Sequence, residues 1–147
     1  MKFFLVFILL LVIINVVRYT SLIKLIEKDQ DYKINGSEDI VYISFMIQSN
    51  DYSPVTIRKK DDLQFVYDLI SEVSLKKDNR NQLIGHLAPR SQIILYVNTD
   101  VDKAGASIQI SNETYLQEGD NVYEILDGYD HFKLYEFLKS YEIDEVN

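Results

Sequence analysis

The feature that most limits how this chain can fold is an apolar run near its amino end, from Phe3 to Val17, broken only by Asn15. As a helix this run would rise about 22 Å, which is short of the roughly 30 Å hydrocarbon core of a bilayer. The length alone is therefore compatible with the apolar region of a signal peptide or with a minimal membrane span.

The residues that follow the run favour a membrane anchor that is not cleaved. A signal peptide needs small residues at its cleavage site, and no such pattern follows Arg18. Apolar residues resume at Leu22, so a continuous helix from Phe3 to Ile26 is predicted to contact the lipid bilayer, with Tyr19 at the headgroup level. We assign residues 1–28 to a signal-anchor transmembrane helix, and cleavage is the alternative.

The orientation of the anchor depends on charges and on the general layout. Lys2 stands before the run, whereas Arg18, Lys24 and Lys28 follow it, and the positive-inside rule then favours a cytoplasmic domain by a small margin. A very short amino tail before one apolar segment, followed by an acidic domain without cysteine, is typical of exported domains. We expect a single-pass protein of the cell membrane with an extracytoplasmic domain.

Residues 29–38 are polar and predict a juxtamembrane spacer, and residues 39–147 are predicted to form one globular domain. The β-branched and aromatic residues 40–47 predict a buried strand, and residues 55–58 a shorter strand that pairs with it or lies at an edge. Apolar residues at helical spacing over 63–73 predict a helix, with Asp61 or Asp62 as its cap and Gln64 completing a capping box.

The second half of the chain predicts a meander of strands closed by a helix. Residues 76–91 are polar or without a period and predict a long loop. Strands are expected at 92–97, 107–110, 115–116 and 122–125, with turns between them. A last helix, capped within Asp127–Asp130, places Leu134, Tyr135, Leu138 and Tyr141 on one face.

Together these elements predict an α+β fold: an N-terminal transmembrane helix, then an antiparallel sheet of about five or six strands with two helices on one face. The order of strands and helices resembles one half of the saddle of TATA-binding proteins. That resemblance implies the fold alone and not the DNA-binding function. The overall plan, rich in Ile, Lys, Asn and Tyr, resembles small membrane-anchored domains of unknown function from low-GC Gram-positive bacteria.

Charge and composition exclude several classes of function. The net charge is -8, and beyond residue 30 the chain has 11 Lys and Arg against 21 Asp and Glu. An acidic domain is repelled by phosphate backbones, so no nucleic acid is expected as a partner, whereas a basic protein or peptide is attracted. The chain has no cysteine, which excludes disulfides, thiolate metal sites and cysteine nucleophiles.

Few residues are suited to catalysis. His86 and His131 are the two histidines; His86 is expected to be packed in a loop and His131 to be solvated or to cap the last helix. No phosphate-binding loop, nucleophile elbow or HExxH motif occurs. The segment Asn98–Asp102 begins like a calcium loop, but the glycine comes late, at Gly105, and Gln109 stands where a glutamate is needed. We expect no cofactor and no metal.

The number of aromatic residues suggests a binding surface instead. Eleven tyrosines and seven phenylalanines exceed what a core of this size requires. A row of exposed tyrosines could bind a partner, because tyrosine buries a large area at a small entropy cost, although packing in the core is the alternative. The tyrosines on or beside predicted strands are Tyr42, Tyr52, Tyr96, Tyr115, Tyr123 and Tyr129.

The sequence thus predicts a non-enzymatic, membrane-anchored domain that binds a protein or peptide at the cell envelope. An alternative is an immunity-type protein that neutralises a cationic toxin at the membrane by electrostatic attraction. A hydrolase or metal enzyme that uses His86 and His131 is the least supported hypothesis.

Overall fold

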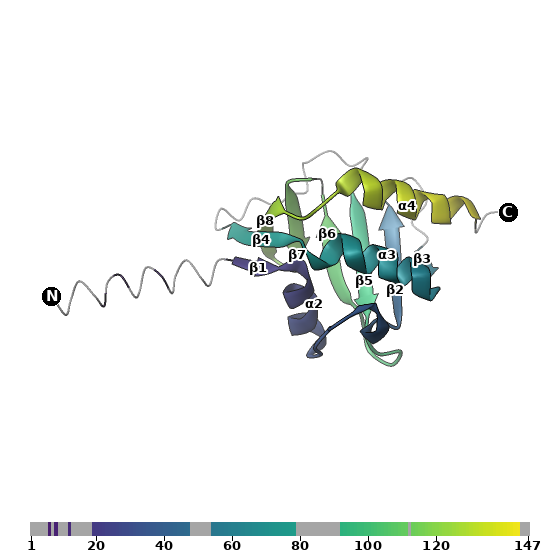
Figure 1. Ribbon diagram of the computed structural model, residues 1–147, viewed down its shortest axis with the longest axis horizontal. Helices are drawn as coiled ribbons and strands as arrows, with labels where there is room; N and C mark the ends of the chain where they lie inside the picture. Colours follow the sequence, from purple (N-terminus) through teal and green to yellow (C-terminus); the bar gives the residue numbers. More distant parts are fainter. Residues whose placement is uncertain are drawn as a thin grey trace.

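The computed structural model describes residues 6, 8, 12, 19–47, 54–78, 92–111 and 113–144. Over these ranges the chain forms one antiparallel sheet of eight strands (Figure 1). The strands are β1 (Tyr19–Ser21), β2 (Tyr42–Ile47), β3 (Val55–Ile57), β4 (Ser74–Asp78), β5 (Ile93–Asn98), β6 (Ala106–Ile110), β7 (Tyr115–Glu118) and β8 (Asn121–Asp127). The helices are α2 (Leu22–Gln30), α3 (Lys60–Ser71), α4 (His131–Asp144) and the 3-10 helix η1 (Ser37–Asp39).

The predicted α+β class with an antiparallel sheet is confirmed, but the sheet is larger than expected. Its strand order is β1-β4-β8-β7-β6-β5-β2-β3. The predicted meander corresponds to β5 to β8, and β3 pairs with β2 at one edge of the sheet. Strands β1 and β4, which the sequence did not predict, extend the sheet at the other edge.

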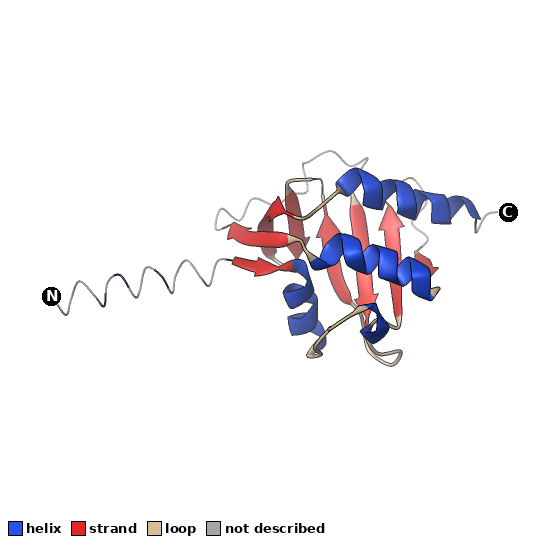
Figure 2. Ribbon diagram, viewed as in Figure 1, coloured by secondary structure: helices blue, strands red, loops and turns tan. Residues whose placement is uncertain are grey.

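One face of the sheet is apolar because alternate residues of each strand point to the same side. On β2 and β5 the buried residues of this face include Ile43, Phe45, Leu95 and Val97, and their partners across the strands are also buried. Figure 2 shows α3 and α4 over this face, and the stacking of Phe65 on Phe137, with ring centroids 4.4 Å apart, joins the two helices.

The predicted helix from Phe3 to Ile26 is wrong beyond residue 18. Tyr19 begins a strand that pairs with β4, and Ser21 caps α2 by accepting a hydrogen bond from the Lys24 N–H at 3.3 Å. The apolar side chains that were expected to contact lipid lie in the core of the domain, where Leu22 and Ile26 are at most 1% exposed. Hydrophobicity alone did not distinguish a lipid-facing helix from a core helix, since both require the same side chains.

The predicted spacer at 29–38 and the domain boundary at Asp39 change for the same reason. Helix α2 continues to Gln30 and ends at Asp31, whose φ of 50° turns the chain back. Ile34 is buried, and its N–H donates to the Glu27 carboxylate at 2.8 Å. The described residues from Tyr19 onward therefore belong to the same folded unit.

Of the apolar run itself, Val6, Ile8 and Val12 are described; all three are helical and exposed. The other residues between 3 and 18 lie outside the described ranges, so the membrane anchor stays a prediction. Within those ranges no helix has both the length and the apolar character needed to cross a bilayer.

The capping box predicted for α3 is wrong. The helix is capped by the backbone of Lys59 without a side-chain hydrogen bond, and Gln64 bonds to Ser37 at 2.5 Å and to Asp68 at 2.7 Å instead. These contacts attach η1 to α3. The cap of α4 is confirmed, because the Asp130 carboxylate accepts the Lys133 N–H at 2.9 Å.

Candidate binding surface

The sheet has a second face that no described helix covers. The register of the strands places on it the residues that alternate with the core residues. We call this surface the open face; it comprises Tyr42, Ser44, Met46, Thr56, Lys76, Asp78, Ile94, Tyr96, Asn98, Ser107, Gln109, Tyr115, Gln117, Val122 and Glu124. Most of these side chains are partly exposed, whereas Asn98 and Val122 are buried.

The six tyrosines singled out in the sequence do not form one surface. Tyr42, Tyr96 and Tyr115 lie on the open face. Tyr123 lies on the core face, opposite Leu116, and is buried. Tyr129 follows β8 and contacts His131, and Tyr52 lies outside the described residues. Of the five described tyrosines of this set, three therefore lie on the open face.

A groove of about 330 Å³ lies on the open face where β2 and β5 meet the β5–β6 loop. Its lining residues are Tyr42, Ser44, Met46, Pro54, Tyr96, Asn98, Lys103, Ala104 and Gly105. The groove exists because small side chains flank a large one: Tyr96 is paired with Ser44 on one side and with Ser107 on the other. Ser44 is held in turn by a 3.0 Å hydrogen bond to Thr56.

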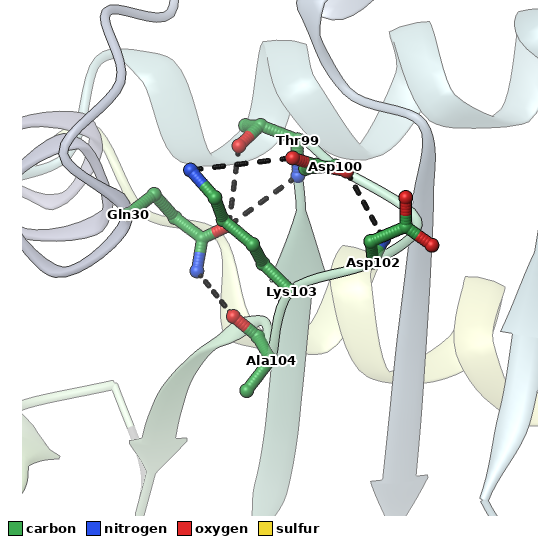
Figure 3. A network of polar contacts seen from close by, with 6 residues as sticks. All are labelled: Gln30, Thr99, Asp100, Asp102, Lys103 and Ala104. Atoms are coloured by element: carbon green, nitrogen blue, oxygen red, sulfur yellow. Dashed lines mark hydrogen bonds and ion pairs between the residues drawn. The ribbon is translucent and has the colours of Figure 1, made fainter.

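One wall of the groove is the β5–β6 loop, and the side chain of Gln30 holds this loop at both ends (Figure 3). The Gln30 amide donates to the Ala104 carbonyl at 2.8 Å. Its carbonyl accepts from the Thr99 hydroxyl at 3.1 Å and from the Thr99 N–H at 3.4 Å. Gln30 is 6% exposed, so these bonds form away from competing water.

Replacing Gln30 by leucine is expected to loosen the groove wall. The substitution keeps the volume but leaves the Ala104 carbonyl without its donor, which costs about 1–3 kcal/mol of unfolding free energy. Amide hydrogen exchange at Thr99 should become faster as the loop opens more often. Gln30→Glu keeps an acceptor for Thr99 but buries a carboxylate against the Ala104 carbonyl, and at neutral pH it should destabilise the loop at least as much as leucine does. Unchanged exchange at Thr99 in Gln30→Leu would show that another contact holds the loop.

Charges of both signs lie beside the groove. Lys103 is the charged residue among the described ones that line it, and its Nζ is 4.0 Å from an oxygen of Asp100 in the same loop. Asp102 follows in that loop, and its N–H donates to Asp100. The Arg58 guanidinium lies over the Tyr42 ring, 4.6 Å from its centroid, but does not line the groove.

The segment that resembles the start of a calcium loop forms the turn beside this groove. Asp100 accepts the Asp102 N–H at 3.0 Å, and the Asn98 amide donates to the Tyr96 carbonyl at 3.0 Å. These oxygens and nitrogens stabilise the turn itself. The part of the chain that the structure describes contains no group of three or more His, Asp or Glu side chains placed to hold a metal ion.

The structure describes one of the two histidines. His86 lies outside the described residues. His131, which was expected to be solvated or to cap a helix, is instead 8% exposed at the start of α4; its Nδ1 is 2.8 Å from the Tyr129 hydroxyl, and its ring stacks on Tyr135. These contacts fix the link between β8 and α4.

Tyr129 is expected to make the folded state less stable at high pH. Burial raises the pKa of Tyr129 far above its ordinary value of 10.0, and the nearby Asp130 and Glu113 raise it further. The unfolded chain loses this proton at a lower pH than the folded chain does. The contribution of Tyr129 to the free energy of unfolding is therefore fully present below pH 10 and decreases above it, by about 1.4 kcal/mol per pH unit.

In Tyr129→Phe this dependence should disappear. The variant is expected to be about 1 kcal/mol less stable than the wild type at pH 8, because a hydrogen bond is lost. The difference in the free energy of unfolding between the variant and the wild type should become smaller between pH 10 and pH 11.5, as measured by urea unfolding. Parallel stability curves for the two proteins would contradict this role of Tyr129.

Local sequence patterns do not indicate several residues in and around the groove. The sequence does indicate that Tyr42 and Tyr96 share a face of their strands opposite to the core, since both alternate with aliphatic residues. Only the strand register shows that Ser44 and Ser107 flank Tyr96 on the neighbouring strands. Gln30 was assigned to the spacer, and nothing in its local sequence shows that it reaches a loop about 70 residues away.

Comparisons of this chain with protein-family models, with curated proteins and with solved structures gave no match.

Proposed function

We propose that this chain is a non-enzymatic, membrane-anchored domain that binds a protein or peptide at the cell envelope through the open face of its sheet. The observation that carries the proposal is the groove beside Tyr42 and Tyr96, on a face that no described helix covers. Partly exposed tyrosines next to a hollow are typical of binding surfaces, because they bury a large area with few rotatable bonds.

Site-specific photocrosslinking in cells of the natural source tests this proposal. A photoreactive phenylalanine derivative at Tyr96 is expected to give a discrete product that contains a second protein. The same group at Tyr32, which is 47% exposed at the end of α2 and away from the sheet, serves as the control and should not give that product. Identical products from both positions, or no product from Tyr96, would contradict a binding role for the open face.

The proposed extracytoplasmic location is supported by the apolar run at residues 3–17, which would anchor the domain to the membrane. An alkaline phosphatase fused after Asn147 is active only outside the cytoplasm. We expect an active fusion, and an inactive fusion at normal expression would place the domain on the cytoplasmic side. The immunity-type alternative rests on the net charge of the domain.

A further inference from the structure

We propose that Asn35 is a modification site, at which the protein deamidates spontaneously through a succinimide formed with Gly36. Asn35 is exposed and lies between α2 and η1, outside the helices and strands that the structure describes. It is the one asparagine of the chain that a glycine follows. This inference does not depend on the proposed binding function.

The backbone of Gly36 is available for the reaction. Its conformation is extended, with φ of -166° and ψ of 178°, and no hydrogen bond within the described part of the chain engages its N–H. Because glycine has no side chain, its nitrogen can approach the neighbouring amide closely. The Glu38 carboxylate lies against Gly36, but it is the end of a flexible and exposed side chain.

The reaction requires water and no other partner. The Gly36 nitrogen attacks the side-chain carbonyl carbon Cγ of Asn35, and the new C–N bond closes the succinimide ring. The bond from Cγ to Nδ2 breaks, and Nδ2 leaves as ammonia with the proton that the Gly36 nitrogen gives up. Water then opens the ring at either carbonyl, which leaves aspartate or isoaspartate at position 35. Asparagine is for this reason among the thermally labile residues of proteins.

Both products fit the native turn less well than asparagine does. The Asp39 carboxylate accepts from the Asn35 N–H at 2.7 Å and from its side-chain Nδ2 at 3.3 Å. In the aspartate product, a carboxylate replaces this amide donor and repels Asp39. Isoaspartate adds a methylene group to the backbone before Gly36, whose carbonyl accepts the Asp39 N–H at 3.2 Å. Deamidation is therefore expected to loosen η1.

The surroundings of the new charge are already acidic. The Tyr67 hydroxyl donates to the Asn35 carbonyl at 3.4 Å. Burial raises the pKa of Tyr67, and so do the nearby carboxylates of Glu38, Asp68, Asp39 and Glu27. A carboxylate at position 35 adds to this negative field, which disfavours the folded turn further.

Mass spectrometry of the full chain, kept in a neutral detergent at neutral pH and physiological temperature, tests the site. Loss of ammonia followed by uptake of water is expected to be faster at Asn35 than at Asn121, which Val122 follows. Gly36→Ala should slow the conversion several-fold, and alanine fits the extended φ of residue 36. Equal rates at Asn35 and Asn121, or an unchanged rate in Gly36→Ala, would overturn the proposal.

Hydrogen exchange at Ile40 tests the consequence for η1. The Ile40 N–H donates to the Ser37 carbonyl at 3.1 Å, and Ile40 is 3% exposed. Asn35→Asp reproduces one product and is expected to speed this exchange about five-fold, the factor that corresponds to two like charges about 4 Å apart in water. Asn35→Ser removes the amide without adding a charge and should change the exchange by less than about two-fold. Equal exchange in the two variants would contradict the predicted loosening of η1.

Discussion

Truncation of Ile26 to alanine is expected to lower the free energy of unfolding by about 2–5 kcal/mol, because it leaves a cavity under α2. The side chain is fully buried within the core cluster, which α2 shares with the sheet and with α3. Chemical unfolding of the full chain in a neutral detergent, followed by tyrosine fluorescence, measures the change. The same residue would contribute little to domain stability if it lay in lipid.

The matched control for Ile26→Ala is Lys24→Ala on the same helix. Lys24 is exposed, and alanine is a good helix former, so this change should stay within about 0.5 kcal/mol of the wild type. If both variants were as stable as the wild type, α2 would not belong to the core, and the helix expected from Phe3 to Ile26 would regain support.

The second large effect is expected at Gly128, which links β8 to α4. Its φ is +79°, and a Cβ would lie 2.3 Å from the backbone oxygen of Glu72 at the end of α3. Gly128→Ala combines a left-handed backbone, which costs about 1–2 kcal/mol, with a backbone clash, which costs about 1–3 kcal/mol more. We expect a loss near the sum of the two terms, measured by thermal and urea unfolding.

Gly119 is the matched control for this prediction because it isolates the backbone term. Its φ is +54° in the β7–β8 turn, and no atom lies within 4 Å of the Cβ position. Gly119→Ala should therefore cost only about 1–2 kcal/mol. Equal losses at both glycines would show that the contact with Glu72 does not restrict residue 128.

The sequence predicted the elements whose burial follows a simple period. Strand β2, the β5–β6 hairpin and α3 all have apolar residues at the spacing that their secondary structure requires, and the structure confirms them with shifts of one to three residues. Strand β4 was predicted as a polar loop, since Leu75 is the one fully buried residue among Ser74–Asp78. Its pairing with β1 and β8 defines this strand, and a local window cannot contain those partners.

The amino-terminal part shows a different limit of sequence analysis. Leu22 to Ile26 continue the apolar character of the preceding run, and composition does not tell a lipid-facing helix from one that covers a sheet. The polar residues at the ends of α2 were the available signals. Ser21 is a favourable cap, and Asp31 tolerates the left-handed conformation that ends the helix. Both signals favour a separate short helix over a continuous span.

The candidate site was predictable in type but not in position. Tyrosine-rich strands indicated a binding surface, yet only the register of β7 and β8 shows that Tyr115 lies on the open face and Tyr123 on the core face. Tyr42 and Lys103 are far apart in the sequence, and only the pairing of β2 with β5 brings them to the same groove.

The central claim is that the groove beside Tyr96 binds the partner. It is tested most directly by the dissociation constant of the protein crosslinked at position 96, measured with wild type, Tyr96→Ala and Tyr32→Ala. Loss of a buried tyrosine at the centre of an interface weakens binding by about ten-fold or more. We predict that loss for Tyr96→Ala and an unchanged constant for Tyr32→Ala. Wild-type affinity in Tyr96→Ala, with weakened binding in Tyr32→Ala, would contradict the claim and place the interface on α2.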